Sequence, residues 1–343
     1  MNRWGEEFPE ADDTNGGIDA DEESAVSERP DLATTLNLLR AVASEGFSAA
    51  LYYGLSGLTR DDRDLLASVW TSLDAEHRQK LMSRLVDLSE TNFDLEYRQM
   101  GLLGLEDEDP GVRESAINLL WEDETPELMA CLVEMAQWDE TAAVRAAAVS
   151  ALGNFILAGE LGGLSERDLY QAQDTVVGIY SNENEDIEVR RRALEAIANS
   201  SHDIVTEAID EAYHSDDQRM RISAVFAMGR TCDPQWKDAV LRELRSDDPG
   251  MRYEAARASG ELELEEAVPY LIALATNQSD REIKEAAIWS LGEVGGERAL
   301  SALSALAQEA EEDGDDSLLE AVEDAIGSAT LANMGLDFEH DDE

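Results

Sequence analysis

The sequence predicts an all-α fold, namely a right-handed α-solenoid in which pairs of helices stack along the chain. Two observations predict this fold. A ten-residue phrase returns at nearly constant intervals, and its apolar residues recur with the period of a helix. The composition agrees, because aromatic residues make up only 6% of the 343 residues while Ala, Leu and Glu dominate.

The repeated phrase first occurs at residues 112–121 and carries a cation at its second position in six copies. The steps between these cations are 32, 45, 31, 31 and 32 residues. Apolar or small residues stand at positions one, five, eight and nine, which is the stripe of an amphipathic helix. Alanine fills position five in all six copies, so neighbouring helices can approach closely. The copies begin at Val112, Val144, Val189, Met220, Met251 and Ile283, and a degenerate copy begins at Leu318.

An aspartate stands just before each phrase, where a carboxylate accepts backbone N–H groups and complements the helix dipole. It can also reach an arginine of its own repeat or of the next one. We therefore expect a structural ladder of aspartates and cations, made of Asp109, Arg113, Asp139, Arg145, Asp186, Arg190, Asp217, Arg221, Asp248, Arg252, Asp280 and Lys284.

The chain divides into four predicted segments. Residues 1–30 hold ten acids and almost no large apolar side chain, so we expect a disordered acidic N-terminal segment. Residues 31–92 read as helices without the phrase and form an N-terminal cap. Residues 93–330 form the solenoid, in which a second amphipathic segment between phrases completes each helix pair. Residues 331–343 form an acidic flexible tail.

The Asp and Val-Arg-x-x-Ala pattern of the phrases resembles HEAT repeats, within the armadillo/HEAT-like class of α-α superhelices. The period of about 31 residues is similar to the short HEAT repeats of phycobilisome-lyase-like proteins. The chain also resembles a group of uncharacterised acidic bacterial HEAT-repeat proteins, which supplies a fold and no established activity. The resemblance covers residues 94–330, and it implies that the phrase helices line the concave side of the solenoid.

The charge balance limits the classes of partner. The chain has 77 acidic and 26 basic residues and a net charge of −51, so it repels nucleic acids and anionic membranes. It contains no apolar run near the roughly 18 residues that a membrane span needs. The N-terminus leads into acidic sequence, and Cys131 and Cys232 read as buried thiols, so we expect a cytoplasmic protein.

Catalytic constellations are missing from the sequence. Deoxyhypusine hydroxylases, which resemble this fold, bind two irons through repeated His-Glu dipeptides. Those dipeptides are absent here, and Glu76-His77 has the reverse order. Phycobilin lyases are a second HEAT-like enzyme class, and no short chemical signature here supports that role. We expect no catalytic residues, no metal and no cofactor in a monomeric, non-enzymatic protein, with a lyase-like role left open.

Aromatic and arginine side chains stand at phrase positions that the core does not need. Such residues dominate interface energetics, so we expect them to bind a protein or peptide partner. In the alternative interpretation they belong to the core, rotated inward by local curvature. The candidates are Phe226, Tyr253, Arg257 and Trp289, together with Ile222, Arg230 and Trp121.

The sequence therefore predicts a protein–protein interaction scaffold or adaptor that docks its partner on the concave face. Two alternatives stay open. The chain could be an accessory subunit of a lyase-type or other modifying enzyme that holds a client protein, or an acidic chaperone or assembly factor for a basic protein. The acidity fits either a solvated surface or a field that steers a basic partner.

Overall fold

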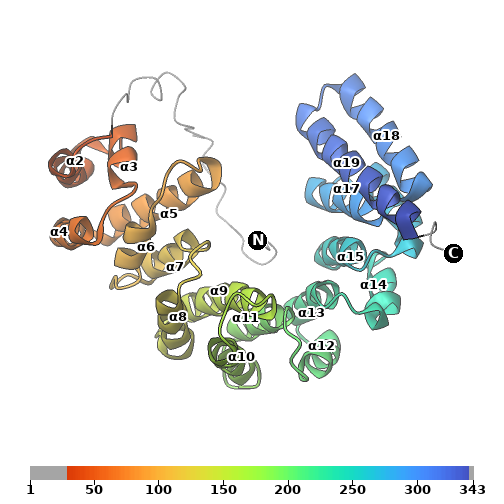
Figure 1. Ribbon diagram of the computed structural model, residues 1–343, viewed down its shortest axis with the longest axis horizontal. Coiled ribbons are helices and arrows are strands. Elements are labelled where there is room, and N and C mark those ends of the chain that lie inside the picture. The colour runs from red at the N-terminus through yellow and green to blue at the C-terminus, as the bar shows by residue number, and fades with distance from the viewer. Residues whose placement is uncertain (1–28, 340–343) are drawn as a thin grey trace. The chain divides into compact units, whose positions relative to one another are not determined.

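The computed structural model describes residues 29–339, and this part consists of helices joined by short turns, without strands (Figure 1). The predicted N-terminal segment 1–30 lies almost wholly outside the described residues, as do residues 340–343. The helices form two compact units, which divide between Ala196 and Ile197. We call residues 29–196 the N-unit and residues 197–339 the C-unit.

In the N-unit, α5, α7 and α9 pack in succession as a first layer, and α4, α6, α8 and α10 form a second layer (Figure 1). The phrase helices α7, α9 and α11 lie in the first layer. The N-unit helices are α2 (Leu32–Glu45), α3 (Ala49–Leu55), α4 (Arg60–Trp70), α5 (Ala75–Thr91), α6 (Arg98–Gly104), α7 (Pro110–Leu119), α8 (Pro126–Trp138), α9 (Ala142–Glu160), α10 (Glu166–Tyr180) and α11 (Ile187–Ile197).

The C-unit has the same two-layer construction. Its phrase helices α13, α15, α17 and α19 pack in succession, and each also contacts a second-layer helix. The last helix continues past the predicted tail boundary at residue 331. The helices are α12 (Val205–Tyr213), α13 (Gln218–Arg230), α14 (Lys237–Glu243), α15 (Pro249–Glu261), α16 (Val268–Asn277), α17 (Arg281–Val294), α18 (Gly296–Asp313) and α19 (Asp316–Glu339), with short 3-10 turns at Pro234–Trp236 and Glu265–Ala267.

Aspartates cap four of the phrase helices. Asp109, Asp217, Asp248 and Asp280 are the N-caps of α7, α13, α15 and α17, and the side chain of each accepts backbone N–H groups of the first turn. These bonds satisfy donors that a helix start leaves unpaired. Two other members of the predicted ladder also accept backbone N–H groups. Asp139 accepts from Thr141, just before α9, at 2.9 Å, and Asp186 accepts from Glu188, in the first turn of α11, at 2.8 Å.

The phrase arginines donate to backbone carbonyl groups more often than to aspartate side chains. Nη1 of Arg113, Arg145, Arg221 and Arg252 donates to the backbone carbonyl six residues earlier, at 2.7–2.9 Å. Each guanidinium thus satisfies an acceptor in the turn before its helix. Arg190 donates Nε to the Tyr180 carbonyl at 2.9 Å. The half-buried Lys284 stands at the same phrase position in α17.

One ion pair within the described residues joins two members of the predicted ladder. Arg113 binds both carboxylate oxygens of Asp139 in the next repeat, at 2.8 and 2.9 Å. Arg145 reaches a different acid of the following repeat, Glu185, at 2.6 Å. The ladder is therefore mainly a set of turn contacts, with cross-repeat ion pairs at the middle of the N-unit.

The N-terminal cap contains a helix that behaves like a phrase helix. Asp74 caps α5, and Arg78 donates Nη1 to the Leu73 carbonyl at 2.6 Å. Arg78 also pairs with Asp107 before α7 at 3.0 Å, which is the counterpart of the contact between Arg113 and Asp139. This repeat was not predicted because Leu81 stands where the other phrases have alanine.

Two expectations from composition need correction. By length and composition alone, α9 is apolar enough to cross a membrane, although 44% of the relevant window is buried within the protein. This helix is apolar because it packs against α7, α8 and α10. Cys232 is exposed rather than buried, because α13 ends at Arg230 and the chain turns there with a left-handed backbone (φ 50°).

Glycine at the tenth phrase position brings neighbouring first-layer helices together. A Cβ atom added to Gly229 would lie 2.8 Å from the Cα atom of Ala258, and one added to Gly260 would lie 3.0 Å from that of Ser290. The residue approached is the small one at position eight of the next phrase. The alanine at position five was predicted to allow close approach, and a Cβ atom added to Gly104 of α6 would lie 2.8 Å from the Cβ atom of Ala116. Positions ten and eight make a second close approach, between first-layer helices.

We predict opposite effects of one substitution at two equivalent glycines. A Cβ atom added to Gly292 would lie 2.9 Å from the Cα atom of Ala325, whereas one added to Gly327 meets no described atom within 4 Å. Gly292→Ala should lower the free energy of unfolding by about 1–3 kcal/mol through overpacking. Gly327→Ala should raise it by about 0.5–1 kcal/mol through helix propensity. Urea denaturation measures both, and equal effects would contradict this packing rule.

Candidate protein-binding face

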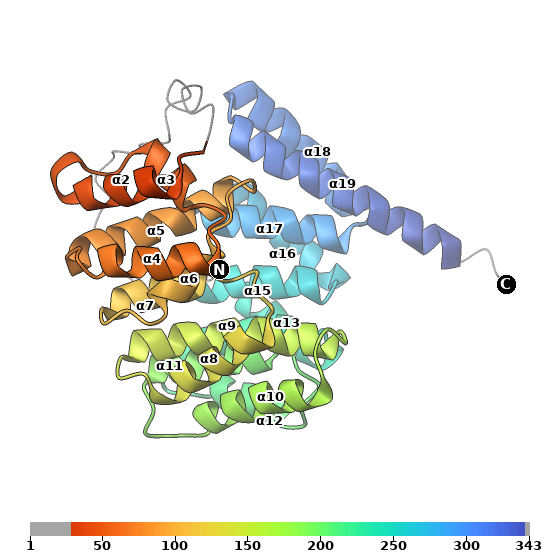
Figure 2. The same cartoon turned by 60° about the vertical axis from the view of Figure 1, so that its left-hand side comes forward.

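Six of the seven predicted partner-binding residues lie on three consecutive first-layer helices of the C-unit. Figure 2 shows α13, α15 and α17 side by side, and each packs against the next. All six side chains are half-buried, which agrees neither with full exposure nor with a place in the core. We call this set the α13–α15–α17 face; it consists of Ile222, Phe226, Arg230, Tyr253, Arg257 and Trp289.

The Trp289 indole is held in a defined position. A Cβ atom added to Gly260 would lie 2.8 Å from the Cζ3 atom of this ring, so the ring packs against α15. The guanidinium of Arg257 stacks over the same ring at 4.4 Å from its centroid. Such a cation–π contact fixes both side chains while leaving part of each open to solvent.

A largely buried carboxylate, that of Glu261, lies beside the stacked pair. Oε1 of Glu261 is 3.3 Å from Nη1 of Arg230 and 4.0 Å from Nη2 of Arg257. Arg230 also donates Nε to Asn199 at 3.0 Å. Burial raises the pKa of Glu261, and the guanidinium of Arg230 opposes that shift more strongly than that of Arg257.

Glu261 and Asn199 were not among the predicted site residues, although the repeat contains a signal for both. Asn199, Arg230 and Glu261 all occupy the eleventh position of their phrases. Likewise, Arg257 and Trp289 both occupy the seventh position. Equivalent positions of neighbouring repeats lie side by side in stacked helices, so these contacts could have been found by comparing columns of the repeat.

Tyr253 and Trp121 differ in their surroundings. Burial raises the pKa of the Tyr253 hydroxyl, and the neighbouring Arg257 opposes that shift. Trp121 belongs to the N-unit and is not part of the α13–α15–α17 face. It lies beyond the last residue of α7, Leu119, with 48% of its surface exposed.

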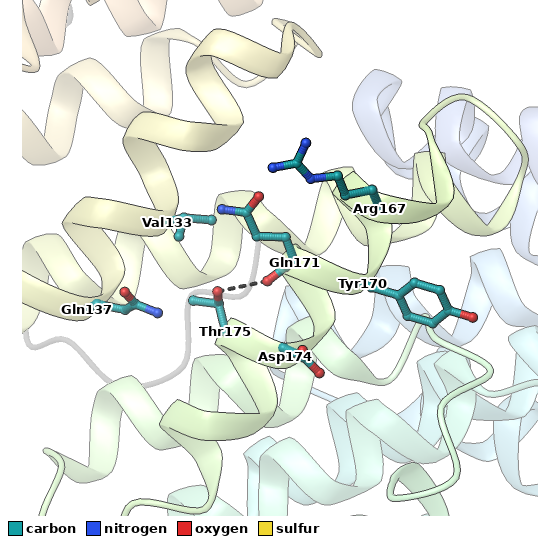
Figure 3. Close-up of a pocket in the computed structure, with 7 residues that line it drawn as sticks. All are labelled: Val133, Gln137, Arg167, Tyr170, Gln171, Asp174 and Thr175. Carbon is teal, nitrogen blue, oxygen red and sulfur yellow. Dashed lines mark hydrogen bonds between the residues drawn. The ribbon is translucent and has the colours of Figure 1, made fainter.

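A hollow of about 460 Å³ lies in the N-unit between α8 and α10, and the sequence analysis singled out none of its residues (Figure 3). Arg167 and Asp174 bring opposite charges to it, two helical turns apart on α10. The mixed lining favours no single class of ligand. It consists of Val133, Gln137, Arg167, Tyr170, Gln171, Asp174 and Thr175. Among residues 29–339, no group of three or more His, Cys, Asp or Glu side chains is placed to hold a metal ion.

A family model described as HEAT repeats matches residues 102–177, 206–289 and 238–323, which together make up more than half of the chain. The chain belongs to the HEAT-repeat family. HEAT-repeat proteins generally bind protein partners, so this chain is a scaffold of the kind that mediates protein interactions. A search of curated proteins found no match to this HEAT-repeat protein.

Solved structures with a similar fold include the complex of CpcE and CpcF of phycocyanin lyase from Nostoc sp. That match has 15% identity and a TM-score of 0.52, and it covers 81% of this chain and 98% of that chain. Human deoxyhypusine hydroxylase matches at 15% identity, with coverage of 87% and 96% and a TM-score of 0.34. Importin beta matches at 17% identity with a TM-score of 0.43, over 90% of this chain and 43% of that one.

We predict a pH-dependent effect of Glu261→Gln. Because the pKa of Glu261 is raised in the folded state, the folded protein binds the proton more tightly than the unfolded one. The contribution of this carboxyl group to the free energy of unfolding is therefore lost as pH rises from the ordinary glutamate pKa of about 4.3 through the raised pKa of the folded state. A glutamine at this position does not titrate, so the variant does not lose this stability. The difference in free energy of unfolding, variant minus wild type, should therefore increase as pH rises across that window.

Denaturant titrations of both proteins between pH 4 and pH 8 test this prediction, because the titration of all other acids cancels in the difference. A difference that stays flat or decreases with pH would mean that the ion pairs with Arg230 and Arg257 outweigh the burial of the carboxylate.

Proposed function

We propose that this HEAT-repeat protein is a scaffold or adaptor without catalytic activity of its own, and that it docks a protein partner on the α13–α15–α17 face. The single observation that carries the proposal is the half-exposed row of aromatic and arginine side chains on three neighbouring helices. Trp, Tyr and Arg are the side chains that most often dominate binding energy at protein interfaces.

The side chains of this face are held in place before any partner binds. Trp289 is fixed between Gly260 and the Arg257 guanidinium, and Arg230 is bonded to Asn199 and Glu261. A partner therefore loses little free energy to ordering these groups, which favours affinity. Flexible surface side chains of the same types would lack this advantage.

The dimensions of the face fit a peptide segment. Packed helices lie about 8–10 Å apart, so three of them span about 20 Å between the outer axes. An extended chain rises about 3.3 Å per residue, so six residues of a partner cover that distance. Within the C-unit, the first-layer helices lie closer together than the second-layer helices, as expected for the inner side of a curved stack.

We predict that the double variant Tyr253→Ala, Trp289→Ala loses its partner. Removing both rings takes away two of the three aromatic side chains of the face, and each hot-spot side chain contributes about 2 kcal/mol or more to binding. Affinity capture from native-source lysate, analysed by mass spectrometry, compares the variant with wild type. Circular dichroism must show equal helix content.

The matched control is Tyr270→Ala in the second layer of the same unit. Tyr270 is also half-buried and also stacks with an arginine, since Arg245 lies 5.4 Å from its ring centroid. This variant should retain every partner that wild type retains. Loss of the partner in both variants, or in neither, would count against docking on the α13–α15–α17 face.

A further inference from the structure

Three large apolar side chains are exposed in the turns that follow three successive first-layer helices of the N-unit. Phe93 follows α5, Trp121 follows α7 and Leu161 follows α9, with exposed fractions of 87%, 48% and 80%. Single exposed apolar residues are ordinary on protein surfaces, whereas several along one edge make that edge a candidate interaction site. This group is distinct from the α13–α15–α17 face, which belongs to the other unit.

The topology brings these three turns to one edge. Arg78 at the start of α5 pairs with Asp107 just before α7, and Arg113 at the start of α7 pairs with Asp139 just before α9. The starts of the three helices are therefore neighbours, and the helices run in the same direction. Their ends, with the turns that follow, lie along the opposite edge. We call it the apolar edge, defined by Phe93, Trp121 and Leu161.

The middle residue of the apolar edge is set back from the other two. Phe93 and Leu161 come 15 and 16 residues after the arginines Arg78 and Arg145, whereas Trp121 comes only eight after Arg113. At 1.5 Å per helical residue, Trp121 is set back by about 10 Å. A partner that lies across Phe93 and Leu161 therefore needs a longer side chain to contact Trp121, whose surface is 48% exposed.

Carboxylates without an ion-pair partner accompany the apolar side chains. Asp94 follows Phe93, while Glu122 and Glu124 lie next to Trp121; all three are exposed, and none forms an ion pair with a described residue. The neighbouring Asp123 is different, because Arg98 binds it at 2.6 Å. A partner that covers the edge must therefore supply cations, or it would bury unpaired charge.

We propose that the apolar edge of the N-unit binds a basic, apolar-rich peptide segment of a partner protein. Apolar side chains of the segment pack on Phe93, Trp121 and Leu161, and its lysines or arginines pair with Asp94 and the two glutamates. A second copy of this chain does not fit the site, because its own net charge is −51. The charge of the whole chain also speeds the approach of a basic segment.

Fluorescence anisotropy with three labelled 15-residue peptides tests the proposal. The first combines leucine with lysine, the second replaces leucine by serine, and the third replaces lysine by glutamate. The leucine–lysine peptide should bind full-length protein at least tenfold more tightly than either of the others. Equal binding of the serine–lysine peptide would mean that general charge attraction alone accounts for binding, and it would overturn the proposal. Absence of binding by the leucine–lysine peptide would also overturn it.

The variant Phe93→Ala, Leu161→Ala should weaken binding of the leucine–lysine peptide about tenfold, which is the expected effect of losing two apolar contacts. Its thermal stability should stay near that of wild type, since both side chains are almost fully exposed. The matched control is Leu65→Ala on α4, another exposed apolar residue of the N-unit, away from the edge (60% exposed). Its affinity should stay within twofold of wild type, and an equal loss in the two variants would overturn the proposal.

Discussion

The close contact between successive first-layer helices is the constraint on which the rest of the structure depends. Glycine at phrase position ten meets a small residue at position eight of the next phrase, with backbone atoms near 3 Å from where a Cβ atom would be, as for Gly229 and Ala258. No larger residue fits there without a shift of the backbone. The contact recurs between α9 and α11, where Gly153 meets Ala196. It therefore fixes the register at the junctions of α9 with α11, α13 with α15, α15 with α17, and α17 with α19.

Because the register is fixed, equivalent positions of successive phrases lie side by side in columns. The columns that face outward form the surface. Arg257 stacks on Trp289 because both occupy position seven, and Arg230 meets Glu261 because both occupy position eleven. The core positions carry the stability of the stack, so the remaining positions are free to specialise. An aromatic and arginine row within one unit, and an apolar edge with unpaired carboxylates within the other, are two such specialisations. The side chains of the first are held by contacts between the packed helices that carry them.

The helical fold and most of its repeats could be predicted from periodicity, because the same phrase with the same stripe recurs and every copy must bury that stripe. Local capping was also predictable, since Asp109 and Asp248 stand where a helix start needs an acceptor. The α5 repeat was not, because Leu81 replaces the alanine by which the phrase is recognised. The preference of Arg221 and Arg252 for backbone carbonyls depends on the shape of the turn, which residue spacing does not reveal. The exposure of Phe93 depends on where α5 ends, and helix ends are the least predictable part of a pattern.

Site-specific photo-cross-linking in the native host tests the central claim most directly, because it reports which surface touches the partner in the cell. Tyr253 and Phe226 would each be replaced by benzoylphenylalanine, with Tyr270 of the second layer as the control position. The account predicts that the two positions on the α13–α15–α17 face yield a cross-link to the same protein and that position 270 yields none. A partner captured from position 270 and from neither of the others would contradict the account.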